Sequence, residues 1–343
     1  MFLVSLYLNT MSTPRKKIAL IILGGTVLIE DSPEKNAVIT GRDVTPWLNK
    51  IPEVNIIAEV EPFFILGEKE TEVNIDHWIK AGKIVANHIR EFDGFIVAHH
   101  TSSLLYGACA FSFMLQNLPK PVVFTGSQIP VNLGQEANKK LFKKYKGLGI
   151  KANLINAIQV ASHGPAEVSI IFGNKLVRAN QAIKEKGLNI NLFDAPAPAV
   201  LGNIDFGIKI EDQNIKKARV PFAFKPDFEK KVSVVSLYQE ESSDLLEWVT
   251  NKKPKGLVIQ MQQSSLSQSQ IKKITELQKS IALVVHTTNP FIKKERPNLL
   301  IVDYMTPEAT LMKFMWALGR TKNMKEIKKI LEQGIAKEIG EEA

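Results

Sequence analysis

A central stretch of the sequence constrains the fold most, because two short apolar runs there each end in a hydroxyl-rich turn. Phe95–Val97 is the first run, and the turn that follows it is His99–Ser103. Apolar residues recur at helical spacing over Leu104–Leu115. Pro121–Phe124 then forms the second run, followed by Thr125–Gln128. Such runs are typical of strands buried on both faces of a parallel sheet. The pattern predicts strand, turn, helix, strand and turn, with ligands bound at the carboxyl ends of the strands.

Length and composition indicate a globular protein of two domains. The chain has 343 residues, of which 45% are hydrophobic and 23% charged, values that are ordinary for globular domains. No stretch approaches the roughly 18 apolar residues of a membrane span. The apolar start at Met1–Leu8 is too short for a signal peptide, and Met11 is an alternative start. The single Cys109 is expected to be a packed core thiol. We therefore expect a cytoplasmic protein without membrane contact.

A basic segment accounts for part of the formal net charge of +9. Five lysines lie between Lys139 and Lys146, with Phe142 and Tyr145 among them. Basic residues interleaved with aromatic ones can bind nucleic acid. The alternative, which we favour, is a solvated surface, so nucleic acid is not expected among the partners.

The start of the chain repeats the pattern of an apolar run followed by a polar turn. Lys17–Leu23 predicts a buried strand, and Gly24-Gly25-Thr26 follows it. Glycines permit a tight turn and bring backbone amides close to a ligand. Further along, Val54–Val60 is predicted to be a strand and Ile75–Ile89 a helix. We expect the strand ends at Thr26, Thr101 and Ser127 to share one edge of a sheet.

The domain organisation follows from a change of composition near residue 205. Residues 1–204 are predicted to form an N-terminal domain and 205–230, with Pro221 and Pro226, a linker. Residues 231–343 are predicted to form a C-terminal α/β domain, because apolar runs and helical patterns alternate there. The predicted strands are Val232–Leu237, Leu257–Gln260, Ile281–Val285 and Leu299–Val302. Thr306-Pro307 marks a helix start, with Thr as N-cap.

Several of these motifs resemble the L-asparaginase family, in particular the bacterial type I group. The segments that carry the similarity are Gly24-Gly25-Thr26, His99-His100-Thr101-Ser102-Ser103, Gly126-Ser127-Gln128-Ile129-Pro130 and the run from Gly173 to Lys184. The resemblance covers nearly the whole chain after the first dozen residues. It implies an asparaginase-like two-domain α/β fold, with a mostly parallel N-terminal sheet flanked by helices and a smaller C-terminal α/β domain.

The resemblance also implies a set of site residues. Thr26 matches the nucleophile, while Thr101 and Lys184 match a proton relay. Gly25 would help to hold the oxyanion; Thr71, Glu72 and Ser102 would bind the substrate. A threonine hydroxyl is a weak nucleophile that needs such a base and oxyanion site. No cofactor and no metal are implied. His99 and His100 are adjacent, and adjacent strand residues point to opposite faces, so a shared metal ion is not expected.

The sequence departs from the family pattern at three places. The family aspartate after the relay threonine is Ser102, and no tyrosine stands between Thr26 and Lys50, where relatives carry one in a lid. The turn Met261–Ser265 replaces a Gly-x-Gly-Asn motif that completes a neighbouring subunit's site. The predicted function is hydrolysis of asparagine or a related small amide by a homodimer or homotetramer. The alternatives are a catalytically impaired paralogue that binds a ligand or partner, and a tRNA-dependent amidotransferase-type subunit.

Overall fold

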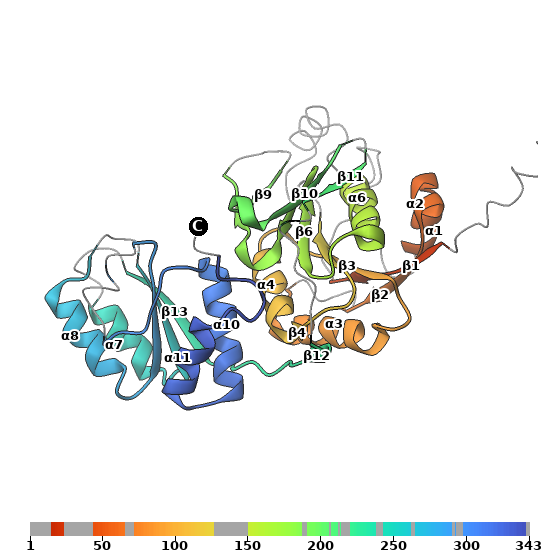
Figure 1. Ribbon diagram of the computed structural model, residues 1–343. Coiled ribbons are helices and arrows are strands. Elements are labelled where there is room, and N and C mark those ends of the chain that lie inside the picture. The colour runs from red at the N-terminus through yellow and green to blue at the C-terminus, as the bar shows by residue number, and fades with distance from the viewer. Residues whose placement is uncertain are drawn as a thin grey trace, which may run out of the picture.

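The computed structural model shows two α/β units side by side, each built around its own sheet (Figure 1). The larger sheet lies in the N-terminal unit and the smaller one in the C-terminal unit. The structure describes residues 15–23, 44–65, 72–126, 150–186, 191–205, 207–211, 213, 220–237, 243–261, 265–289, 292 and 298–340.

The larger sheet has eight described strands in the order β11-β10-β7-β6-β5-β3-β1-β2. The strands from β6 to β2 run parallel, whereas β7, β10 and β11 each pair antiparallel with their neighbour. The parallel arrangement predicted for β1, β3 and β5 is confirmed. The strands are β1 (Lys16–Ile22), β2 (Ala58–Phe64), β3 (Gly94–Ala98), β5 (Val122–Thr125), β6 (Val168–Phe172), β7 (Lys175–Arg178), β10 (Val200–Ile204) and β11 (Ile208–Ile210).

Both faces of this sheet are covered by helices, which explains its continuous apolar runs. Successive side chains of a strand point to opposite faces. Phe95 and Val97 accordingly pack in one core cluster, and Ile96 and Ala98 pack in another. The first face is covered by α3 (Ile75–His88) and α4 (Leu104–Met114), and the second by α1 (Val44–Asn49), α2 (Pro52–Ile57) and α6 (Ile150–His163).

One predicted strand is wrong over half of its length. The prediction for Val54–Val60 was a strand, but residues up to Ile57 belong to helix α2, and the strand begins at Ala58. Pro52 occupies the first turn of α2, where its missing N–H and fixed φ favour a helix. Strand β2 lies at the edge of the sheet and contains Pro62, which an edge strand tolerates.

The smaller sheet is parallel, in the order β13-β14-β15-β16. Its four strands match the four predicted apolar runs, with shifts of one or two residues at some ends. Thr306 caps α10 by accepting a hydrogen bond from the Ala309 amide, which confirms the predicted helix start. The elements are β13 (Val232–Leu237), α7 (Ser243–Asn251), β14 (Gly256–Met261), α8 (Gln268–Leu277), β15 (Ala282–His286), β16 (Ile301–Val302), α10 (Pro307–Arg320) and α11 (Met324–Glu332).

The two units share one hydrophobic cluster, because α10 packs against α4 (Figure 1). Residues between the sheets also pair with the N-terminal unit, where β12 (Ala223–Phe224) joins β4 (Leu115–Gln116). The remaining short elements are the 3-10 turns η1 (Ala179–Gln181) and η2 (Ala197–Ala199) and the paired strands β8 (Ile183–Lys184) and β9 (Phe193–Asp194). The exact domain boundaries at 204 and 231 stay a prediction.

Across the part of the chain that the structure describes, none of the helices has both the length and the apolar character needed to span a membrane.

Candidate active site

The carboxyl ends of β1, β3 and β5 meet at one edge of the larger sheet. The Leu23 amide donates to the Ala98 carbonyl at 3.1 Å, and the His99 amide donates to the Thr125 carbonyl at 2.9 Å. These bonds continue the parallel pairing past the last residue of each strand. The carboxyl ends of β1, β3 and β5 therefore lie side by side, at the edge where α/β sheets bind ligands.

His99 anchors the turn after β3 inside the core. The Trp78 indole donates from Nε1 to His99 Nε2 at 2.8 Å, and His99 Nδ1 lies 2.9 Å from the His100 carbonyl oxygen. Because an indole N–H only donates, Nε2 is the acceptor and Nδ1 carries the proton. Burial lowers the pKa of His99 to about 4, although its bond to the His100 carbonyl opposes this. His99 is thus a neutral structural anchor and not a base for the site.

Two glycines allow this anchor to be packed closely. A Cβ on Gly107 would lie 2.9 Å from Trp78 Nε1 and 3.0 Å from His99 Nε2. A Cβ on Gly126 would lie 2.2 Å from the His99 carbonyl oxygen. The turns after β3 and β5 consequently approach each other more closely than any larger residue permits.

Thr101, Ser102 and Ser103 form the turn between β3 and α4. Ser102 is exposed, Thr101 and Ser103 are half-buried, and Ser103 is the N-cap residue of α4 without a side-chain cap bond. Lys184 reaches this turn from β8, and its Nζ donates to the Thr101 carbonyl oxygen at 3.3 Å. The structure thus brings Thr101 and Lys184 together, although 83 residues separate them in sequence.

The other predicted site residues are placed less completely. Gly25, Thr26, Thr71 and Ser127 lie outside the described residues. Glu72 and Ser102 are described and exposed. Within the described residues, no hydrogen bond or ion pair joins Glu72 or Ser102 to Thr101 or Lys184. Their predicted roles in substrate binding therefore stay predictions.

The described residues do not include a group of three or more His, Cys, Asp or Glu side chains able to hold a metal ion. Both ring nitrogens of His99 are engaged within the protein. His100 is half-buried, and burial lowers the pKa of its imidazole.

Cys109 is buried on α4, which confirms the predicted core thiol. Burial raises the pKa of this thiol well above its ordinary value, so the nucleophilic thiolate is disfavoured. The hydrogen bond between Trp78 and His99 was not predicted from the sequence. The one available signal was Trp78 itself, which lies on an amphipathic helix. A buried indole N–H needs a hydrogen-bond acceptor, so a polar partner could have been expected.

These features define a class: two-unit α/β proteins with hydroxyl groups and a lysine at the carboxyl edge of the larger sheet. The family model described as "Asparaginase, N-terminal" matches residues 17–216, which is more than half of the 343 residues. The chain belongs to the asparaginase family. It is assigned as an amidohydrolase because it belongs to that family.

Relatives with this sequence pattern carry two kinds of name. The chain is 26% identical to the L-asparaginase of Thermococcus kodakarensis over 302 residues, covering 82% of this chain and 87% of that one. It is 25% identical to a glutamyl-tRNA(Gln) amidotransferase subunit of Pyrococcus abyssi over 350 residues, covering 94% of this chain and 76% of that one.

The fold is shared with solved asparaginase structures. The thermostable L-asparaginase from Thermococcus kodakarensis superposes with a TM-score of 0.78 at 23% identity, covering 95% of this chain and 100% of that one. The asparaginase-like two-domain α/β fold expected from the sequence is thereby confirmed.

Proposed function

We propose that this protein hydrolyses asparagine or a related small amide to the acid and ammonia, through an acyl intermediate on Thr26. The observation that carries the proposal is the contact between Lys184 and Thr101 at the edge where β1 also ends. Lys184 Nζ bonds to the backbone carbonyl of Thr101, which brings the lysine to the turn that carries the Thr101 hydroxyl, beside the strand that leads to Thr26. A base and a hydroxyl group near the nucleophile are what a threonine nucleophile requires.

The proposed reaction has two halves. Thr26 attacks the amide carbon while its hydroxyl proton passes to the relay of Thr101 and Lys184. The backbone amide of Gly25 supports the oxyanion, and the proton then leaves with ammonia. Water repeats the attack on the acyl group and regenerates Thr26. Thr71, Glu72 and Ser102 are the proposed contacts to the substrate.

Ammonia release from a panel of small amides tests this proposal. We expect turnover of at least one amide by the wild-type protein and its loss in Thr26→Ala. Lys184→Met should lower kcat strongly, whereas Lys186→Met, a lysine two positions along, should not. If the wild-type protein releases no ammonia from any amide while binding it, the chain is a non-catalytic paralogue.

Assembly and location form part of the same proposal. We expect a homodimer or homotetramer, because similar enzymes complete their sites between subunits; light scattering at micromolar concentration measures this. A monomer there would contradict it. The cytoplasm is the proposed compartment, since the one cysteine is a buried free thiol and no disulfide can form within the chain.

A second candidate function is participation in a tRNA-dependent amidotransferase. The similarity to the Pyrococcus abyssi amidotransferase protein over 94% of this chain favours it. The basic segment Lys139–Lys146, which lies outside the described residues, would then contact tRNA. Tight tRNA binding that resists salt and disappears when these lysines are replaced by glutamate would favour this function over the first.

A further inference from the structure

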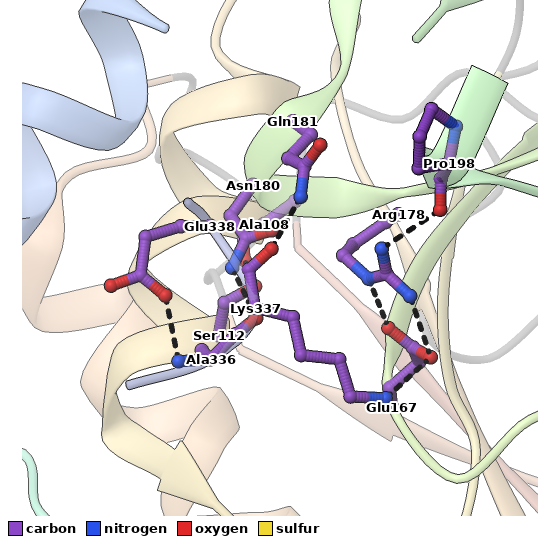
Figure 2. Close-up of polar contacts among 10 residues, drawn as sticks. All are labelled: Ala108, Ser112, Glu167, Arg178, Asn180, Gln181, Pro198, Ala336, Lys337 and Glu338. Atoms are coloured by element: carbon purple, nitrogen blue, oxygen red, sulfur yellow. Dashed lines mark hydrogen bonds and ion pairs between the residues drawn. The ribbon is translucent and has the colours of Figure 1, made fainter. Parts of the chain in front are cut away.

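The segment Gln333–Gly340, which follows α11, returns to the N-terminal unit and contacts the residues that lead to Lys184 (Figure 2). A cavity of about 160 Å³ lies beside it, between Ile335–Lys337 and the end of α4. Ile335 and Ala336 pack against the hydrophobic core, and hydrogen bonds and ion pairs add to the attachment of the segment.

A buried ion pair fixes the shape of this segment. Lys313 of α10 pairs with Glu338, and neither side chain is exposed to solvent. The Glu338 carboxylate also accepts the backbone amides of Ile335 at 3.1 Å and Ala336 at 2.7 Å. Lys313 Nζ donates further to the carbonyls of Leu331 at 2.9 Å and Gln333 at 2.6 Å. The two charged side chains thus find their remaining hydrogen-bond partners in the backbone of residues 331–338, and these bonds hold the residues in one loop.

The loop in turn holds η1. The side-chain amide of Asn180 donates to the Ala336 carbonyl at 2.7 Å, and that of Gln181 donates to the Lys337 carbonyl. Both side chains are buried. In addition, Lys337 Nζ lies 3.0 Å from Glu167, which accepts from Arg178 Nε at 2.7 Å (Figure 2). The backbone from Arg178 to Gln181 is therefore attached to the loop at three places.

Lys184 lies three residues beyond Gln181, which is at most about 10 Å of extended chain. The Ala182 amide bonds to the Ala179 carbonyl, and the Glu185 amide bonds to the Leu192 carbonyl at 2.9 Å, so both flanks of Lys184 are fixed to backbone. The Lys184 side chain itself is exposed and makes the 3.3 Å bond to Thr101. Its place at the turn depends on where η1 holds the backbone.

We propose that the segment Gln333–Gly340 positions Lys184 at the candidate active site, with Asn180 and Gln181 as the positioning residues. The geometric part of this inference stands without any activity, and only its effect on turnover rests on the proposed function. Displacing the segment should move Lys184 away from Thr101 while the sheet remains folded.

Hydrogen exchange read by mass spectrometry tests the geometric part. Asn180→Asp keeps the shape but turns the donor into an acceptor against the Ala336 carbonyl. Asn156→Asp is the matched control, because Asn156 donates to the Gly173 carbonyl at the same 2.7 Å from α6, on the other face of the sheet. We expect exchange in residues 179–186 to rise about tenfold in Asn180→Asp at pH 8, and not in the control.

Hydrogen exchange of Asn180→Asp measured at lower pH distinguishes the loss of this bond from a general loss of stability. Once protonated, the carboxyl introduced at position 180 can donate again, so protection of residues 179–186 should recover below its pKa. Gln181→Met removes the second bond without adding charge, and it should raise exchange there at every pH. Unchanged exchange in both variants, or an equal rise in Asn156→Asp, would overturn the proposal.

Kinetics test the consequence for turnover. In an active protein, Asn180→Asp should lower kcat about tenfold and leave KM within about threefold. Equal loss of kcat in Asn156→Asp would assign the effect to stability and count against positioning. If the wild-type protein has no turnover but Asn180→Asp still loosens residues 179–186, the proposed function fails while the positioning is supported.

Discussion

The interactions around the two ends of α4 are of opposite kinds. At its start, beside the candidate site, the contacts are neutral or exposed: the Trp78–His99 bond, the Ser102 hydroxyl and the bond from Lys184 to Thr101. Near its end, ion pairs prevail: Lys313 with Glu338, which are both fully buried, and Glu167, which Arg178 shares with the partly exposed Lys337 (Figure 2). Charged groups at the site must remain free to react, whereas charges at the far end can be committed fully to structure.

The largest expected effect concerns the buried ion pair between Lys313 and Glu338. Glu338→Gln leaves Lys313 buried without its counter-ion, which typically costs about 3–5 kcal/mol of unfolding free energy. Urea denaturation measures this loss. If it is below about 1 kcal/mol, the far end of α4 does not depend on the ion pair and the contrast between the two ends is wrong.

The double variant Lys313→Met/Glu338→Gln serves as its control. Removing both charges eliminates the unpaired ion, so most of the lost stability should return. Failure to recover would instead indicate that the two carboxylate bonds to Ile335 and Ala336 are the larger contribution.

The next effect concerns the neutral end and its pH dependence. Burial lowers the pKa of His99 from 6.5 to about 4. Between these two pH values the unfolded chain binds a proton that the folded protein excludes. His99 therefore costs nothing above pH 6.5, and the free energy of unfolding falls as the pH drops from 6.5 toward 4. The difference between the pKa values corresponds to about 3 kcal/mol.

His99→Gln isolates this contribution from other titrating groups. Glutamine still offers an oxygen to the Trp78 indole but does not titrate. Unfolding free energies measured from pH 7 to pH 4 should fall less in the variant than in the wild-type protein. Parallel curves for the two proteins would show that His99 is protonated without penalty.

A smaller effect is expected at Gly107. Alanine there raises helix propensity by about 1 kcal/mol, but its Cβ would lie 2.9 Å from Trp78 Nε1 and 3.0 Å from His99 Nε2. Overpacking of a rigid ring pair typically costs about 1–3 kcal/mol, so we expect a net loss of stability. Gly334→Ala, at a glycine with open space around its Cβ, is the control for thermal unfolding.

The last effect is a change in binding affinity and not in stability, and it is the most informative about substrate. Ser102→Asp restores a carboxylate to the exposed turn at the start of α4. A charge-assisted hydrogen bond to an α-ammonium contributes about 1.5–3 kcal/mol, so asparagine should bind about tenfold more tightly or better. Calorimetry and ammonia release measure this, with Ser103→Asp as the control one position along. No gain in either assay would point to the absent lid tyrosine or the altered turn Met261–Ser265 as the defect and would favour the non-catalytic alternative.

The strands of both units were predictable because their burial is encoded locally. Phe95–Val97 and Val232–Leu237 are apolar runs whose neighbours in sequence suffice to define them. The end of α2 was not predictable, because Val54–Ile57 carries the same residue types as a strand. Only Pro52 at the helix start distinguishes this segment from a strand.

The candidate site was predictable only in part, for a physical reason. Trp78 and His99 are 21 residues apart, and nothing in either local pattern states that the indole bonds to the imidazole. Lys184 was assigned through family resemblance, and the structure brings it to Thr101. The roles of Gly25, Thr26, Thr71, Glu72 and Ser102 remain predictions. The hydrogen bond from Asn180 of η1 to Ala336 forms only when both units are folded and packed together. Local sequence patterns do not contain this information.

The distance in sequence between η1 and its acceptors has a consequence during synthesis. Asn180 and Gln181 each bond to a carbonyl 156 residues further along the chain. At roughly 5–20 residues per second, a ribosome needs roughly eight to thirty seconds to add that length. For this interval the nascent N-terminal unit carries two amide side chains without their final acceptors. If the segment Gln333–Gly340 positions Lys184 as proposed, we expect Lys184 to reach its final place only after translation has passed Lys337.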